Sequence, residues 1–62
     1  MQNTFGVLNH EGVHIDVSDS LKGAKNYATR HGYTKVSVRY DMGYIAYIVA
    51  EKINGKWVNI EN

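Results

Sequence analysis

The chain has 62 residues with no cysteine and no proline, and its formal net charge is +1, from seven Lys and Arg against six Asp and Glu. Without cysteine, a disulfide-built fold and a CxxC zinc knuckle are excluded, and a reducing cytoplasm suits the chain. No apolar run approaches the roughly 20 residues that span a bilayer, and the first residues lack the pattern of a targeting peptide. We therefore expect one small cytoplasmic domain over residues 1–62 without membrane association, whose core supplies no more than roughly 3 to 5 kcal/mol.

Two short strands are predicted at the start of the chain, over residues 4–8 and 13–17. Along the second segment, three β-branched residues alternate with two polar ones in the order Val13, His14, Ile15, Asp16 and Val17. This alternation is typical of a half-buried strand. Residues 9–12 are of the types that favour a turn between the two strands.

The same region contains a literal metalloprotease pattern, since His10-Glu11-Gly12-Val13-His14 matches H-E-x-x-H. That chemistry needs a helix, which brings both histidines onto one face to hold zinc while the glutamate acts as general base. Gly12 and the β-branched residues that follow it disfavour a helix here. We therefore expect no metal ligands in the chain, and a zinc hydrolase is only a remote alternative.

One helix is predicted from about residue 19 to residue 31. Ser18 is a suitable N-cap, Asp19 complements the helix dipole in the first turn, and Gly32 suits the left-handed position after the last turn. Apolar residues recur at spacings of three and four, at Leu21, Ala24, Tyr27 and Ala28. Because half of them are alanine, the helix can lie close on a sheet.

The C-terminal part, residues 35–60, reads KVSVRYDMGYIAYIVAEKINGKWVNI and predicts a three-stranded antiparallel meander. Asp41-Met42-Gly43 and Asn54-Gly55 lie between runs rich in Val, Ile, Tyr and Trp, and Asn-Gly between such runs is a strong hairpin signal. The sequence therefore predicts an α+β fold in the order β-β-α-β-β-β, with one helix packed on one face of an antiparallel sheet.

Side chains that are neighbours along a strand point to opposite faces of the sheet, which assigns the outer strands of this meander. The side chains on one face are predicted to form the core: Val36, Val38, Tyr40, Val58 and Ile60. The side chains on the other face are predicted to point outward: Ser37, Arg39, Trp57 and Asn59. With loops of equal length, Arg39 and Trp57 share the outer face.

The assignment of the middle strand, residues 44–53, depends on the lengths of the two loops. Two-residue loops, Met42-Gly43 and Asn54-Gly55, bury one set of side chains, namely Ile45, Tyr47, Val49 and Ile53. They leave the other set, Ala46, Ile48, Ala50 and Lys52, beside Trp57. Three-residue loops exchange the two sets. We favour the two-residue loops because they bury the larger side chains, although the sequence leaves this register open.

The outer face of the meander is the strongest functional signal in the sequence. Tryptophan and arginine are enriched at binding hot spots, and here Trp57 and Arg39 have small or aliphatic neighbours. The predicted partner-binding set consists of Trp57, Arg39, Asn59, Ser37, Lys52 and Ile48. The predicted occupant is a protein partner, and a second copy of the chain, giving a homodimer, is an alternative.

A basic stretch supports a nucleic-acid alternative. Between Asp19 and Asp41 the chain has five basic residues and no acidic one, namely Lys22, Lys25, Arg30, Lys35 and Arg39. Such a stretch could follow a phosphate backbone, with aromatic side chains available for base stacking. The net charge of +1 is small beside that of typical nucleic-acid-binding domains, which makes this the weaker hypothesis.

No arrangement of catalytic residues is recognisable in the sequence. A nucleophile motif such as GxSxG is absent, and the glycines of the hairpins are explained by turn geometry rather than by phosphate binding. We therefore expect a non-enzyme without a cofactor.

The segments AKNYATRHGYTKVSVRY and VAEKINGKWVN form a predicted helix followed by a meander. This arrangement resembles small accessory proteins of bacteriophages and mobile elements, some of which inhibit host or defence enzymes. The resemblance implies a stoichiometric protein-binding inhibitor or modulator in the bacterial cytoplasm. It carries over no catalytic or ligand-binding residues.

Overall fold

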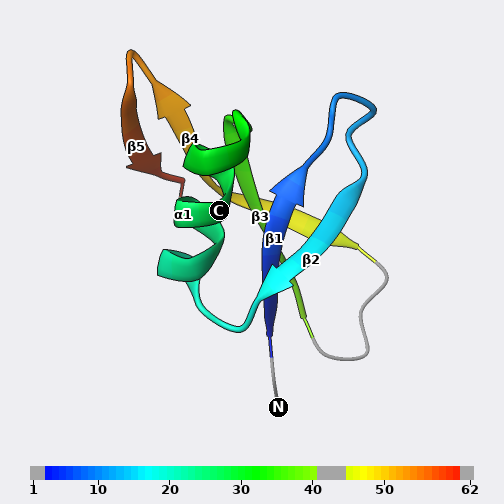
Figure 1. The fold of residues 1–62 in the computed structure, drawn as a ribbon. Helices are drawn as coiled ribbons and strands as arrows, with labels where there is room; N and C mark the ends of the chain where they lie inside the picture. Colours follow the sequence, from blue (N-terminus) through cyan, green and yellow to red (C-terminus); the bar gives the residue numbers. More distant parts are fainter. Residues whose placement is uncertain (1–2, 41–44, 61–62) are drawn as a thin grey trace.

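The computed structural model describes residues 3–40 and 45–60 and contains one helix and five strands in this part of the chain. In chain order the elements are β1 (Thr4–Leu8), β2 (His14–Ser18), α1 (Leu21–His31), β3 (Lys35–Arg39), β4 (Ala46–Ile53) and β5 (Lys56–Asn59). The strands form one antiparallel sheet in the order β2-β1-β3-β4-β5 (Figure 1). The predicted α+β fold, its element order and the C-terminal β3-β4-β5 meander are confirmed.

Helix α1 begins two residues later than the sequence predicts. Its N-cap is Ser20, whose Oγ accepts a hydrogen bond from the Gly23 amide at 3.1 Å. The predicted N-cap, Ser18, is instead the last residue of β2, and its Oγ accepts a hydrogen bond from the Ser20 amide. Asp19 therefore precedes the helix. At the other end Gly32 adopts the predicted left-handed conformation, with φ of 80°.

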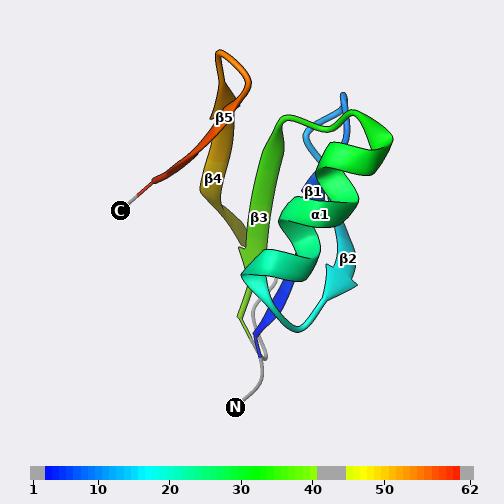
Figure 2. The same ribbon diagram turned by 60° about the vertical axis from the view of Figure 1, so that its left-hand side comes forward.

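The helix packs on one face of the sheet, over β1, β2 and β3, while the β4-β5 hairpin extends beyond it (Figure 2). Ala24 and Ala28 of α1 are fully buried, which confirms that alanine brings the helix close to the sheet. Among the described residues, the buried hydrophobic side chains are all valine or alanine: Val7, Ala24, Ala28, Val36, Val38 and Ala50. The core is therefore small, and larger side chains surround it.

A bulge at Val49 reverses the faces of the sheet in the second half of β4. Ser37 pairs with Ile48, as two-residue loops predict, but the next residue of β3, Val36, pairs with Ala50 instead of Val49. The extra residue exchanges inside and outside for everything that follows it. Ala50 is therefore buried in the core, whereas the sequence placed it outside.

The bulge also makes the predicted faces of β5 wrong. The two-residue Asn54-Gly55 loop is confirmed, since Ile53 pairs with Lys56 and the φ angles are 52° and 80°. However, Ile53 and the predicted core residue Val58 lie on the face away from the helix, with 49% and 44% of their surfaces exposed. Trp57 lies on the helix side and contacts the core.

The far end of β3 and β4 carries three predicted core residues that are exposed: Tyr40, Ile45 and Tyr47. Tyr47 pairs with buried Val38 and so lies on the helix side, yet α1 packs mainly on β1, β2 and β3 and leaves it uncovered. The rings of Tyr40 and Tyr47 instead contact each other, with centroids 5.7 Å apart. The predicted Met42-Gly43 loop lies outside the described residues.

Candidate functional site

The predicted partner-binding residues do not form one surface. Trp57, Lys52 and Asn59 lie on the helix side of the sheet, because their ladder continues from buried Ala50. The remaining three, Ser37, Arg39 and Ile48, lie on the opposite side. The prediction that Trp57 and Arg39 share a face is therefore wrong, and the bulge at Val49 is the cause.

Trp57 is held by contacts from both the helix and the sheet. Its Nε1 donates a hydrogen bond to Thr29 Oγ1 of α1 at 3.2 Å, and the half-buried indole packs against the edge of the core. Lys52, its cross-strand neighbour, places Nζ 5.2 Å from the ring centroid. Lys25 of α1 donates to Asn59 Oδ1 at 3.0 Å. We call these five residues the Trp57 face.

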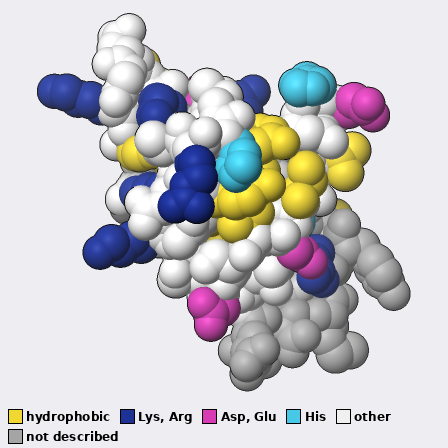
Figure 3. Space-filling view, in the orientation of Figure 1, with side chains coloured by type: hydrophobic (Ala, Val, Ile, Leu, Met, Phe, Trp, Pro, Cys, Tyr) yellow, Lys and Arg dark blue, Asp and Glu magenta, His cyan; other side chains and the backbone are white. Residues whose placement is uncertain are grey.

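The Trp57 face is basic. Lys22, Lys25 and Thr29 recur at spacings of three and four and so share one side of α1. Lys52 lies beside the indole and Lys25 binds Asn59 two residues further along β5, so two lysines belong to the Trp57 face, and the helix contains no acidic residue. Figure 3 shows Lys and Arg side chains spread over the left-hand half of the molecule, where α1 and the β4-β5 hairpin lie. This surface suits an acidic partner.

The rest of the predicted basic stretch lies elsewhere. Arg30 falls on the other flank of α1, about 100° around the helix from Thr29. Lys35 pairs with Glu51 and, like Arg39, lies on the sheet face away from the helix. The five basic residues between positions 19 and 41 therefore do not form one continuous surface.

The face away from the helix carries a row of hydrogen-bonded polar side chains. His14 Nδ1 lies 2.5 Å from Ser37 Oγ, and its Nε2 lies 2.7 Å from Asp16 Oδ1. The guanidinium of Arg39 then donates to both Asp16 oxygens, at 3.3 and 2.8 Å. The row crosses from β2 to β3 above Gly6 of β1, where the missing side chain leaves room.

Electrostatics in this row favour the ionised carboxylate. The hydrogen bond from Arg39 holds the pKa of Asp16 below its usual range. Partial desolvation acts in the opposite direction, and the hydrogen bond with His14 lowers the pKa further. The Asp16 side chain is half exposed, so water screens these interactions. The carboxylate thus acts as an anchor for two side chains.

The order Ser37, His14, Asp16 has the residue types of a nucleophilic triad, but its accessibility does not suit that chemistry. A nucleophile must reach a substrate carbon, within about 3 to 3.5 Å for attack. Ser37 has no exposed surface and lies beneath the histidine ring. In this arrangement the Ser37 hydroxyl is the hydrogen-bond partner of His14 Nδ1, so this ring nitrogen has a partner inside the fold.

The H-E-x-x-H string has no helix. His10 lies in the turn after β1 and His14 opens β2, so the sequence-based expectation of a turn and a strand is confirmed. Asn9 builds the turn, with its Oδ1 accepting from the Glu11 and Val13 amides. In the described part of the chain, no three His, Cys, Asp or Glu side chains are grouped so as to hold a metal ion.

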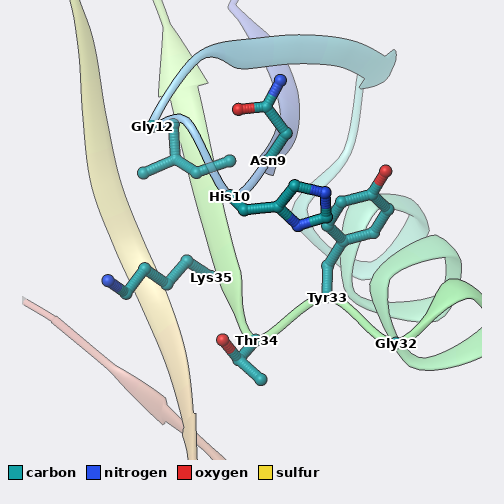
Figure 4. Close-up of a pocket in the computed structure, with 8 residues that line it drawn as sticks. Asn9, His10, Gly12, Gly32, Tyr33, Thr34 and Lys35 are labelled. Carbon is teal, nitrogen blue, oxygen red and sulfur yellow. The ribbon is translucent and has the colours of Figure 1, made fainter.

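A pocket of about 320 Å³ lies between the β1-β2 turn and the segment that follows α1 (Figure 4). It is lined by Leu8, Asn9, His10, Gly12, Gly32, Tyr33, Thr34 and Lys35. His10 enters the lining from the β1-β2 turn and Tyr33 from the segment after α1, and Lys35 extends from β3 (Figure 4). The volume is at the lower limit for small-molecule sites. The lining contains two basic side chains, His10 and Lys35, and no carboxylate. It therefore offers no acid–base pair with a carboxylate.

Sequence analysis did not identify Thr29 or Gly6 as important. Thr29 follows Lys25 by four residues on one helix side, which is the spacing that could have indicated a shared surface. Gly6 interrupts an apolar strand, and such a glycine often marks a close approach of other atoms.

Comparisons with family models, with curated proteins and with solved structures found no match to this chain. No helix in the described residues is long and apolar enough to cross a membrane.

Proposed function

We propose that this chain is a non-enzymatic protein-binding module that docks through the Trp57 face onto an acidic surface of its partner. The observation that carries the proposal is the fixed, half-buried indole of Trp57, held by Thr29 and flanked by Lys25 and Lys52. Tryptophan is among the residues most enriched at hot spots, where a few anchored side chains supply most of the binding energy. A pre-positioned ring loses little conformational freedom on binding.

The charge of the face supports an acidic partner. Lysines around a central aromatic side chain form the arrangement expected at an interface, with an anchor in the middle and charges at the rim. Rim charges of one sign raise the rate of association with a surface of the other sign, and salt weakens this effect. Binding through the Trp57 face should therefore weaken as salt concentration rises.

The resemblance of the helix and meander to small phage and mobile-element accessory proteins supports a class of partner. On that basis we infer a bacterial host or defence enzyme, bound in the cytoplasm by a stoichiometric inhibitor or modulator. The absence of cysteine from the chain agrees with a reducing compartment.

Nucleic acid is a second candidate ligand for the same face. An exposed part of an indole can stack on a base, and Lys22, Lys25 and Lys52 can neutralise phosphates. Three lysines are few for this purpose, and Lys35 and Arg39 lie on the other side of the sheet. The protein partner is therefore the better supported of the two.

Affinity capture from a bacterial lysate tests the proposal and separates the two candidates. Immobilised chain should retain one protein in stoichiometric amount with and without nuclease treatment, and Trp57→Ala should retain at least tenfold less. Val58→Ala is the matched control, because Val58 is the next residue of β5 and lies on the opposite face. Circular dichroism verifies that both variants are folded. Retention that disappears with nuclease favours nucleic acid, and equal losses in both variants contradict the use of the Trp57 face.

A further inference from the structure

The outer edge of β2 is a surface separate from the Trp57 face. β2 is an end strand, and among the described residues no strand pairs with its outer edge. The Val13 carbonyl accepts a hydrogen bond from the Asn9 amide at 3.1 Å, so it points towards β1. Because these directions alternate along a strand, the N–H and C=O groups of His14 and Asp16 point outward. The edge therefore presents backbone groups ready to pair with another strand.

An apolar strip accompanies this edge on the helix side of the sheet. Val13 and Ile15 are 54% and 36% exposed, and Ile15 pairs with a buried residue of β1. On the flank of α1 away from Trp57, the ring of Tyr27 lies 4.3 Å from that of His31 and 6.1 Å from that of Tyr33, measured between centroids. Figure 3 shows hydrophobic side chains gathered on this side of the helix, over β1 and β2.

The edge lacks the residues that usually prevent strand pairing. Natural edge strands are protected by lysine, proline and β-bulges, among other devices. The β1-β2 ladder is irregular at Val17, and the pairing of His14, Ile15 and Asp16 with β1 is regular. Residues 13–17 contain no Lys, Arg or Pro, whereas β5, the strand at the other end of the sheet, begins with Lys56. The one acidic side chain of β2, Asp16, is paired with Arg39 on the face away from the helix.

We propose that β2 pairs antiparallel with β2 of a second copy of this chain, about a two-fold axis at Ile15. The sequence Val-His-Ile-Asp-Val is self-complementary about that residue. Ile15 then faces Ile15 of the second copy, and His14 faces Asp16 of the second copy. The outward backbone groups of His14 and Asp16 give hydrogen-bonded pairs in this register, while the two Ile15 residues form the closer pair without hydrogen bonds.

Neighbouring registers are less favourable. A shift that makes Asp16 face its own counterpart brings two carboxylates together, and like charges directly opposite each other destabilise a strand pair. A shift in the other direction makes His14 face itself and places Asp16 opposite Gly12 of the second copy. Gly12 has a φ of 78° and belongs to the turn, so it cannot continue a ladder.

A second copy adds apolar burial that the small core lacks. The fully buried hydrophobic residues in the described part are valine and alanine only. A domain of about 60 residues buries only about 60% of the surface that its unfolded chain exposes, and association is a common way to increase this. Pairing at β2 covers Val13 and Ile15 of both copies and leaves the Trp57 face free.

Sedimentation equilibrium over a range of concentrations tests the dimer. The mass should rise from 7.0 kDa to twice that value as concentration increases. Ile15→Lys, which places a lysine at the centre of the edge, should weaken association by about a hundredfold or more. Val58→Lys is the control, since Val58 is similarly exposed but lies on β5, and it should associate as the unaltered chain does. A mass of 7.0 kDa at every concentration up to about 1 mM would overturn the proposal. Any strand that pairs with the edge of β2 would then have to come from another protein.

Cross-linking tests the register and remains informative if Ile15→Lys does not fold. The chain has no cysteine, so Ile15→Cys introduces a single thiol. In the proposed register the two Cα atoms at position 15 lie about 4.5 Å apart, which is within the range of a disulfide. Mild oxidation should give a covalent dimer at least tenfold faster than for Val58→Cys. Equal rates for the two variants would contradict pairing at Ile15.

Discussion

His14 of β2 forms a hydrogen bond with Ser37 of β3 although a whole strand separates them, because the intervening residue of β1 is Gly6. A Cβ atom on Gly6 would lie 3.0 Å from His14 Cε1 and would overlap the Ile15 carbonyl. The glycine thus permits both the close approach of β2 and the reach of the imidazole. The polar row on this face of the sheet depends on that space.

Gly6→Ala should therefore destabilise the fold. Overlap with a backbone carbonyl cannot be relieved by turning a side chain, so the strands must separate, at a cost of about 2 kcal/mol or more in the free energy of unfolding. Urea unfolding followed by circular dichroism measures this. Thr4→Ala, two residues earlier on the same face of β1, should cost less than about 1 kcal/mol. An unchanged stability for Gly6→Ala would show that the close contact is not present.

His14 and Ser37 should be energetically coupled. Each single alanine substitution leaves the other polar group without its partner, so the double variant should lose less than the sum of the two single variants. We expect a coupling free energy of about 1 kcal/mol from a double-mutant cycle. The same cycle with His10, which lies in the β1-β2 turn, should give no coupling with Ser37. Additivity for His14 and Ser37 would contradict the hydrogen bond.

Asp16 should make stability depend on pH in the acid range. Its pKa is lowered in the folded chain by the hydrogen bond from Arg39, whereas the unfolded value is about 3.9. Unfolding therefore takes up a proton as the pH falls, so this contribution is full above about pH 4 and is lost as the pH drops through the folded pKa. The stability difference between the unaltered chain and Asp16→Asn should accordingly shrink below about pH 4. A difference that stays constant from pH 7 to pH 2 would argue against the Asp16–Arg39 pair.

The fold was predictable because its signals are local. Alternation predicts a strand over residues 13–17, which the structure has one residue later as His14–Ser18, the Asn54-Gly55 turn fixes a hairpin, and Gly32 ends the helix. Helix capping was less certain from sequence, since Ser18 and Ser20 are both suitable residues two positions apart. The structure places Ser20 at the cap because Ser18 still belongs to β2.

The candidate site was less predictable because one irregular residue decides it. No glycine or proline at Val49 indicates the bulge in the sequence. The bulge nevertheless moves Trp57 from the predicted outer face to the helix side. Side-chain parity is reliable only as far as the next bulge. Exposure of Tyr47 was also missed, since strand patterns do not tell how far a helix extends across a sheet.

The most direct test of the central claim compares two double charge reversals in binding to the captured partner. Lys25 and Lys52 belong to the Trp57 face, whereas Lys35 and Lys56 lie on the other side of the sheet. Both double variants change the net charge equally, so a change in overall charge does not distinguish them. Nuclease-treated lysate should yield at least tenfold less partner with Lys25→Glu/Lys52→Glu and about the same amount with Lys35→Glu/Lys56→Glu. Equal losses of partner in the two variants would mean that overall charge, and not the Trp57 face, controls binding. A loss confined to the Lys35 and Lys56 variant would place the interface on the opposite face.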